Sequence, residues 1–237
     1  MKTTDHTQLT VRRAGDRFRS KLDWLESYHT FSFGEHYDPA HMGFRSLRVI
    51  NDDIVAPGKG FGAHPHRAME IFTYIISGQL AHQDSMGNGR TISAGEFQYM
   101  SAGTGVTHSE INPSTTDPVH LLQIWILPNS DGAPRYRDFD TKPLRQQNGL
   151  TLLASPDGGD ESMEIRQDAA IHIGHLGIGH SLDLPASEDR PYRWLHLIGG
   201  SLTVATTTLA PGDAASFHGN AHLKATEDAE FLVFHLA

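Results

Sequence analysis

Two short segments of the chain place imidazole and carboxylate side chains at a spacing suited to a metal ion. The first holds His64 and His66, and the second holds His108 and Glu110. Successive side chains of an extended strand point to opposite faces, so residues two apart share a face. If the two strands lie opposite each other, three imidazoles and one carboxylate converge on one point. Three neutral nitrogens and one anionic oxygen suit a divalent first-row metal and leave coordination positions open.

Histidine is abundant in this chain, so chance pairs have to be considered. There are 16 histidines among 237 residues, and some His-x-His and His-x-Glu pairs arise without any function. The surroundings favour a metal site, because Gly58 stands six residues before His64, Gly105 stands three before His108, and Asn112 stands four after it. The chain has no cysteine, whose thiolates are typical of closed structural zinc sites.

In order and spacing, these residues resemble the two segments of the cupin superfamily, G-x5-H-x-H-x3,4-E-x6-G and G-x5-P-x-G-x2-H-x3-N. Two departures are informative. Seven residues separate Glu70 from Gly78 where the cupin pattern has six, and Ser101 stands at the usual position of proline. Together with residues 31–39, which read Phe-Ser-Phe-Gly-Glu-His-Tyr-Asp-Pro, these departures resemble the pirin branch of the cupins.

Four further segments are similar to the pirin family, at residues 64–67, 74–78, 82–88 and 100–110. The resemblance is strong over about residues 10–130 and weaker towards the C-terminus, where residues 153–158 match bacterial members. It implies an all-β bicupin, in which two antiparallel β-barrels of the jelly-roll type follow each other with little helix. It also implies that the N-terminal barrel holds the metal.

The residue pattern agrees with such a fold. A length of 237 residues permits one large or two small domains, and 23 glycines with 12 prolines provide many turns. Only residues 16–27 show helical spacing, which indicates a short helix or turn. In the first half we expect strands at 47–55, 70–77, 79–84, 90–93, 96–101, 106–112 and 119–127. In the second half we expect them at 150–154, 165, 170–176, 192–198, 201–205, 214–217, 222–225 and 230–236.

A proline-rich stretch without apolar periodicity begins at Pro128 and indicates a linker. We therefore expect an N-terminal metal-binding barrel at residues 1–130, a linker at 131–146 and a C-terminal barrel at 147–237. The second half lacks a His-x-His pair followed by His-x-Glu. Its histidines are expected on the surface or in the core, and the C-terminal barrel is expected to hold no metal.

Charge and hydropathy exclude several classes of protein. The net charge of −9 argues against general nucleic-acid binding through a basic surface. No apolar run approaches 18 residues, so no membrane span is expected, and no apolar segment of a secretory signal follows the first residues. We expect a cytoplasmic monomer. The chain also lacks a G-x-S-x-G elbow and a P-loop.

Two carboxylates compete for the metal. Glu70 lies an even number of residues from His66, which would place it on the metal face of a continuous strand. The resemblance to pirins instead implies that Glu110 supplies the carboxylate, and that Glu70 lies beside a ligand or is displaced from the site.

The resemblance also implies an activity. A metal with three histidines and one glutamate carries a residual charge of about +1, which stabilises a bound enolate or phenolate. Bacterial pirin-like proteins are known as a family for quercetin 2,3-dioxygenase activity, which opens the central ring of a flavonol with dioxygen and releases carbon monoxide. We therefore expect an oxidoreductase in which Glu110 is catalytic and accepts the proton of the flavonol 3-hydroxyl. Iron is the first expectation for the metal, and nickel, copper, manganese and zinc suit the same donors.

A flat polyphenol also needs an apolar slot. Phe61, Tyr74, Met100 and Trp125 lie on expected strands and are available to line it, although each is more often an ordinary core residue. An alternative function is a metal-dependent redox-sensing or protein-binding module without turnover, which eukaryotic pirins resemble as transcriptional co-regulators. A cupin that has lost turnover and keeps only the fold is a third hypothesis.

Overall fold

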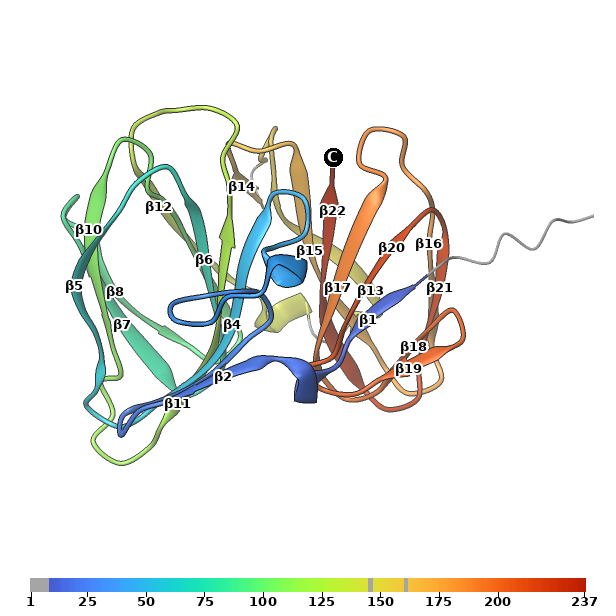
Figure 1. Ribbon diagram of the computed structural model, residues 1–237, viewed down its shortest axis with the longest axis horizontal. Coiled ribbons are helices and arrows are strands. Elements are labelled where there is room, and N and C mark those ends of the chain that lie inside the picture. The colour runs from blue at the N-terminus through green and yellow to red at the C-terminus, as the bar shows by residue number, and fades with distance from the viewer. Residues whose placement is uncertain (1–8, 145–146, 160–161) are drawn as a thin grey trace, which may run out of the picture. The chain divides into compact units, whose positions relative to one another are not determined.

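The computed structural model describes residues 9–144, 147–159 and 162–237. Strands dominate these residues, which confirms the predicted all-β bicupin class (Figure 1). Three short 3-10 helices interrupt them: η1 (Ala14–Asp16), η2 (Pro39–His41) and η3 (Lys142–Leu144). The start of the predicted first barrel and residues 145–146 of the predicted linker lie outside the described residues.

The chain divides into two compact units. One, called the N-terminal barrel here, comprises Arg17–Pro143 and Met163–Gln167. The other, called the C-terminal barrel, contains the described parts of Met1–Asp16, Leu144–Ser162 and Asp168–Ala237. The division differs from the expected boundaries because β1 (Thr10–Arg12) pairs with β20 of the C-terminal barrel.

Two antiparallel sheets form the N-terminal barrel. The larger has the order β12-β9-β6-β11-β4-β3-β2, and the smaller has the order β5-β10-β7-β8. The strands of this unit are β2 (Phe18–Lys21), β3 (Leu25–His29), β4 (Leu47–Val55), β5 (Gly60–His66), β6 (Glu70–Ser77), β7 (Gln79–Asp84), β8 (Gly89–Ser93), β9 (Glu96–Ser101), β10 (Val106–Ile111), β11 (Val119–Ile126), β12 (Arg135–Asp140) and the two-residue β14 (Met163–Glu164).

The C-terminal barrel repeats this plan. In its larger sheet β1, β20, β17, β22, β15 and β13 are neighbours in this order, and its smaller sheet has the order β16-β21-β18-β19. Its remaining strands are β13 (Gly149–Ser155), β15 (Ala169–Leu176), β16 (Ser181–Leu184), β17 (Tyr192–Gly199), β18 (Leu202–Val204), β19 (Thr207–Leu209), β20 (Ala214–His218), β21 (Ala221–Ala225) and β22 (Ala229–Leu236).

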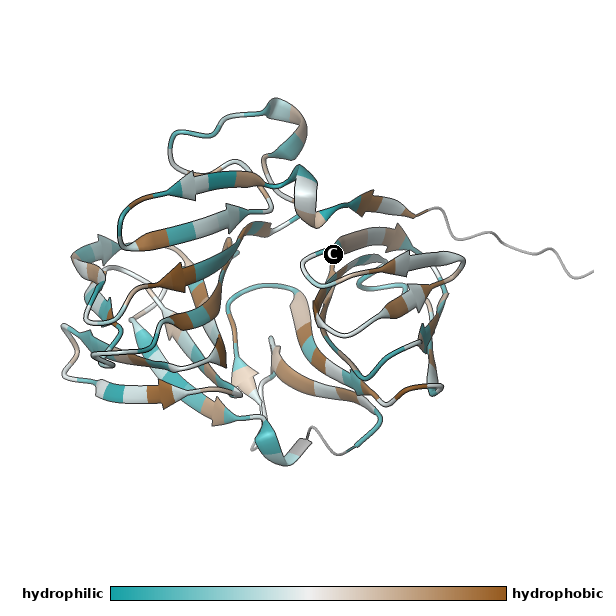
Figure 2. Cartoon of the chain, turned by 90° about the horizontal axis from the view of Figure 1, so that it is seen from below, coloured by the Kyte–Doolittle hydropathy of each residue, from teal (hydrophilic) through white to brown (hydrophobic). Residues whose placement is uncertain are grey.

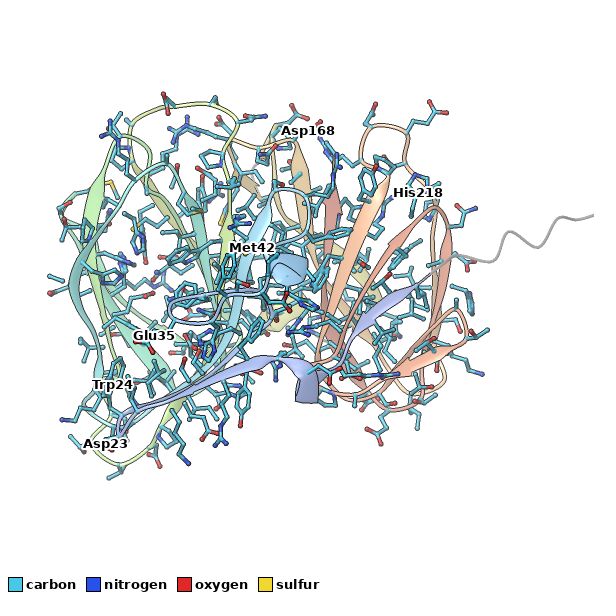
Figure 3. The ribbon with its side chains drawn as sticks, viewed as in Figure 1. Asp23, Trp24, Glu35, Met42, Asp168 and His218 are labelled. Atoms are coloured by element: carbon cyan, nitrogen blue, oxygen red, sulfur yellow. The ribbon has the colours of Figure 1, made fainter. Side chains whose placement is uncertain are left out.

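Every expected strand longer than one residue coincides with an observed strand to within one residue at each end. Of the helix or turn expected at residues 16–27, the helix is wrong, because β2 and β3 form an antiparallel hairpin there and a turn joins them. Asp23 and Trp24 lie at its turn (Figure 3), and Trp24 packs edge-on against Phe61. Tertiary packing of this kind outweighs a short helical pattern. The single residue expected as a strand at 165 lies just after β14.

The expected linker also contains a strand. β12 pairs with β9 along its whole length, from Arg135 opposite Ser101 to Asp140 opposite Glu96. β12 lies at the edge of its sheet and alternates charged with partly buried side chains, so it lacks the apolar run that marks a central strand.

Apolar side chains fill one part of the N-terminal barrel and leave another part open. A cluster packs there from Val55, Ile75, Leu80, Ile92, Val119 and Leu121, with Trp24, Leu25 and Phe61 against it. Burial of each large side chain contributes roughly 1.5–3 kcal/mol. Along the strands, hydrophobic and hydrophilic bands alternate (Figure 2), as expected when one face of a sheet packs inward. Within the described residues, no helix has the length and hydropathy to cross a membrane.

Candidate metal centre

Two adjacent antiparallel strands, β5 and β10, bring three of the predicted ligands together. Their register places His108 opposite His64, and Val106 opposite His66. The centres of the three imidazole rings are 4.5 to 4.9 Å apart. Each ring offers a nitrogen, and the three nitrogens lie within 4.8 Å of one another.

The separation of these nitrogens suits one metal ion. The Nε2 atoms of His108 and His64 are 3.1 Å apart. Two nitrogens bound at about 2.1 Å to the same ion are about 3.0–3.4 Å apart in octahedral or tetrahedral geometry. Burial, together with the charge of neighbouring histidines, lowers the pKa of His66 to about 4 and that of His108 to about 3. These two rings are therefore neutral at pH 7, which is the form that coordinates a metal.

Hydrogen bonds orient two of the rings. Nδ1 of His64 donates to the carbonyl oxygen of Gly62 at 2.7 Å, which leaves Nε2 free to coordinate. Nδ1 of His108 lies 3.2 Å from Nε2 of the buried His82, whose ring stacks on Tyr136. When Nδ1 of His108 carries the proton, its Nε2 is likewise free. The sequence gives no signal for His82 beyond its place in an alternating strand.

Glu110 shares the inward face of β10 with His108, since both are buried while the residues beside them are more exposed. A β-bulge after His108 sets Glu110 opposite Phe61. Oε1 of Glu110 accepts from Thr73 Oγ1 at 3.1 Å, and Oε2 accepts from Gln123 Nε2 at 2.6 Å. The structure therefore places the carboxyl group in the same cavity as the histidines, but outside the group of closely spaced ligand atoms that the three rings form.

The carboxyl group of Glu110 is easily protonated. Burial and, to a smaller extent, the nearby Asp53 raise its pKa to about 7 against the opposing effect of the hydrogen bonds from Thr73 and Gln123. A carboxyl group with such a pKa can take up or release a proton near neutral pH. A cation bound nearby favours the ionised form.

Glu70 faces away from the histidines. Its neighbour Ile71 lines the cavity, so the side chain of Glu70 points to the opposite side of β6. There it accepts hydrogen bonds from the Ser101 hydroxyl at 2.6 Å and from the Tyr99 hydroxyl. Ala68, with φ of 49°, turns the chain between β5 and β6. The even spacing of His66 and Glu70 therefore does not place their side chains on the same face. This placement agrees with the interpretation of Glu70 as displaced from the site.

A cavity of 240 Å³ extends from the histidines into the barrel. Small-molecule sites range over about 300–1,000 Å³, so this cavity has room for a single small molecule. Phe61 and Trp125 line it as expected, whereas Tyr74 and Met100 do not and are buried in the core. The lining residues are Leu25, Ser27, His29, Phe33, Asn51, Asp53, Phe61, His64, His66, Ile71, His108, Glu110, Gln123 and Trp125.

The polar part of this lining comes from β3, β4 and β11 and was not predicted from the sequence. A signal exists on β4, where Asn51, Asp52 and Asp53 interrupt an otherwise apolar strand. On β3 the polar residues Ser27 and His29 fall in or next to the stretch with helical spacing, so they gave no such signal.

The C-terminal barrel has a buried histidine pair of its own, since the rings of His172 and His235 are 4.8 Å apart. Burial lowers the pKa of His172 to about 4 and that of His235 to about 3, and the charge of Arg193 adds to both shifts. Within the described parts of the chain, only one group brings three or more potential metal-ligating atoms close together, and it consists of His64, His66 and His108. That the C-terminal barrel holds no metal stays a prediction.

Comparison with known proteins matches both halves of the chain. The profile of the family described as Pirin matches residues 10–126, and that described as Quercetinase C-terminal cupin domain matches residues 152–236. A protein of Escherichia coli K12 named quercetin 2,3-dioxygenase is 43% identical over 232 residues, which cover 95% of this chain and 97% of the relative.

Solved structures agree with these matches. The bacterial pirin YhhW from Escherichia coli, in complex with nickel(II), has a TM-score of 0.91 and 40% identity, covering 97% of this chain and 99% of that one. The protein YhaK from Escherichia coli has a TM-score of 0.73 and 29% identity, covering 89% of this chain and 93% of its own. The resemblance seen in the sequence is thus confirmed, and the chain belongs to the pirin family.

Proposed function

We propose that this protein is a metal-dependent dioxygenase that opens the central ring of a flavonol such as quercetin and releases carbon monoxide. One observation carries the proposal: three imidazoles and one buried carboxyl group meet in a cavity that has room for one small molecule. The name of the Escherichia coli relative and the nickel complex of the Escherichia coli pirin support it.

His64, His66 and His108 would hold the metal, with Glu110 as the fourth ligand. A divalent ion bound there supplies Lewis acidity that stabilises an oxyanion of the substrate. Nitrogen and carboxylate donors accept several first-row metals. The nickel complex of the related pirin favours nickel as one such ion, and iron stays a prediction.

The protein's own groups bind the flavonol and move its proton. The carboxylate of Glu110 accepts the proton of the 3-hydroxyl group, since a nearby cation keeps Glu110 ionised while burial of the group favours proton uptake. Phe61 and Trp125 lie on the cavity wall, where their rings contact a flat aromatic substrate. Phe33 packs edge-on against Trp125 and helps to exclude water.

Turnover by reconstituted protein tests the proposal. Metal-free protein is loaded in turn with iron, nickel, copper, manganese and zinc, its metal content is measured, and the loss of quercetin and formation of carbon monoxide are followed under air. At equal metal content, Glu110→Gln should lower turnover by about 10²–10⁴-fold, because it removes the proton acceptor. His218→Ala, at an exposed position of the C-terminal barrel (Figure 3), should change turnover by no more than a few-fold.

No turnover of quercetin with any of the five metals would refute the proposed enzyme and favour the redox-sensing or protein-binding alternative. Full turnover by Glu110→Gln would keep the enzyme and refute the role of that carboxyl group. The monomeric state, the cytoplasmic location and the lack of nucleic-acid binding stay predictions.

A further inference from the structure

The cavity has two walls of different chemistry. The three histidines and Glu110 come from β5 and β10 of the smaller sheet, together with apolar Phe61. The larger sheet contributes polar side chains from three of its strands: Ser27, His29, Asn51, Asp53 and Gln123. A molecule in the cavity therefore meets the metal ligands on one side. On the other side it meets these polar side chains beside the apolar Leu25, Ile71 and Trp125.

These polar residues form one continuous patch, which we call the polar wall. β3 pairs with β4 so that Ser27 lies opposite Asp53 and His29 lies opposite Asn51, and β11 places Gln123 opposite Asn51. Residues directly opposite each other in a sheet have adjacent side chains. All five side chains are buried. Polar groups buried in this way are destabilising unless hydrogen bonds satisfy them.

Most polar atoms of the wall have protein partners. Nδ1 of His29 lies 2.8 Å from Oδ1 of Asn51, and Nε2 of His29 lies 2.9 Å from the Ser20 hydroxyl. The Ser27 hydroxyl bonds to the carboxyl group of Asp53. The patch is therefore held in place by its own bonds and forms a fixed surface.

Two buried oxygens are exceptions. Neither Oδ1 of Asp53 nor Oε1 of Gln123 has a hydrogen-bond partner among the described residues. Asp53 and Gln123 expose only 2% and 7% of their surface, and both line the cavity. An occupant that donates hydrogen bonds would satisfy both oxygens.

We propose that Asp53 and Gln123 form a subsite that accepts hydrogen bonds from phenolic hydroxyl groups of the substrate other than the 3-hydroxyl group at the metal. The inference rests on the proposed function and narrows its substrate class to polyhydroxylated flavonols. An aromatic core without these hydroxyl groups leaves both oxygens unpaired, so it binds less tightly.

Gln123 links this subsite to the proton acceptor. Its Nε2 donates to Glu110, so its Oε1 must face another direction. A hydroxyl group that donates to Oε1 favours the same orientation of the amide. A hydroxylated substrate therefore stabilises the bond that positions Glu110.

Binding of two flavonols tests the subsite. Quercetin and 3-hydroxyflavone share the three-ring core and the 3-hydroxyl group, but 3-hydroxyflavone has no other hydroxyl. Each is titrated without dioxygen into nickel-loaded protein, and binding is followed by ligand absorbance. The wild type should bind quercetin about tenfold more tightly than 3-hydroxyflavone, the effect of one or two added hydrogen bonds.

Variants assign part of that preference to Asp53. Asp53→Leu should lower the preference, leaving only the part that Gln123 supplies, while its affinity for 3-hydroxyflavone stays within about threefold of the wild type, because one acceptor is lost. Asp53→Asn keeps a carbonyl oxygen and should retain most of the preference. The matched control is Asp52→Asn on the same strand, whose side chain faces the other side of the sheet and bonds to Arg17 and His120. It should leave the preference unchanged.

The outcomes separate this inference from the proposed function. If the wild type binds neither flavonol, the proposed function fails. If it binds both with equal affinity, the subsite is refuted while the proposed function stands. If Asp53→Leu weakens both ligands equally, Asp53 is a structural residue and the inference is refuted. Thermal melting shows whether Asp53→Leu folds. If it does not fold, the preferences of the wild type and of Asp53→Asn for quercetin over 3-hydroxyflavone decide whether the subsite exists.

Discussion

Replacing Glu110 with glutamine should make the metal-free protein more stable above pH 7 while weakening its metal binding. The two side chains have nearly the same shape, so the cavity is preserved. Gln123 can turn its amide so that Oε1, which lacks a partner, accepts from the new amide group. The hydroxyl of Thr73 then donates to the oxygen that remains.

The magnitude follows from the pKa of Glu110. Burial raises this pKa from its ordinary value of 4.5 to about 7. Between these two values the folded protein binds more protons than the unfolded chain, so its stability falls as pH rises through this window. The loss is complete above pH 7. Since each tenfold change in proton affinity corresponds to about 1.4 kcal/mol, the wild type should lose about 2 kcal/mol through this group between pH 5 and pH 8.

Urea denaturation of both proteins in the presence of a chelator measures this loss. The free energy of unfolding is determined at pH 5, 6, 7 and 8, and the difference between wild type and Glu110→Gln cancels the titrating groups that do not interact with Glu110. Asp53 does interact with it, so Asp53→Asn is introduced into both proteins as a control. The difference should shift by about 2 kcal/mol in favour of the variant as pH rises. If the difference in unfolding free energy does not change with pH, the raised pKa of the buried Glu110 is refuted. Equal nickel affinity of the two proteins refutes its role as a ligand.

Three further predictions concern the metal, the backbone and acid stability. A chelator should lower the melting temperature of metal-loaded wild type but not of the His64→Ala, His66→Ala double variant. The reason is that metal at a hundredfold excess over Kd stabilises the folded protein by about 2.7 kcal/mol. If the chelator lowers the melting temperature of both proteins equally, the metal binds elsewhere. Gly60→Ala should lower the melting temperature and nickel affinity together, since its Cβ would lie 2.1 Å from a backbone oxygen of β10; unchanged melting refutes this close approach. Burial lowers the pKa values of His172 and His235 below the ordinary histidine value of 6.5, so the unfolded chain takes up protons more readily than the folded protein. The free energy of unfolding that these two residues contribute above pH 6.5 is therefore lost as the pH falls towards 4. Replacing both with glutamine should therefore flatten the decline in unfolding free energy between pH 7 and 5, and an unaltered decline contradicts their neutral burial.

Much of the fold was predictable because its signals are local. Alternation and turn glycines place β4, β6 and β9 correctly from sequence alone. The edge strands β12 and β2 were not predicted. They carry charged side chains on one face, so they lack the apolar pattern that marks a central strand.

The clustering of the three histidines was predictable for the same reason, because a two-residue spacing fixes which side chains share a strand face. His64 and His66 could be paired without knowing the rest of the fold. Glu70 could not be placed by spacing, because the turn at Ala68 breaks the alternation. The polar wall was missed because Asp53 and Gln123 are distant in sequence, and only the pairing of β4 with β11 brings their strands together.

A crystal structure of the nickel-loaded protein, with anomalous scattering to locate the ion, tests the central claim most directly. One donor atom each from His64, His66, His108 and Glu110 should lie about 2.0–2.4 Å from a single nickel ion. For Glu110 this requires a carboxyl oxygen to move closer to the three histidines than it lies in this structure. An ion bound elsewhere, or a nickel ion held by the histidines alone with Glu110 beyond bonding distance, would contradict the four-ligand site.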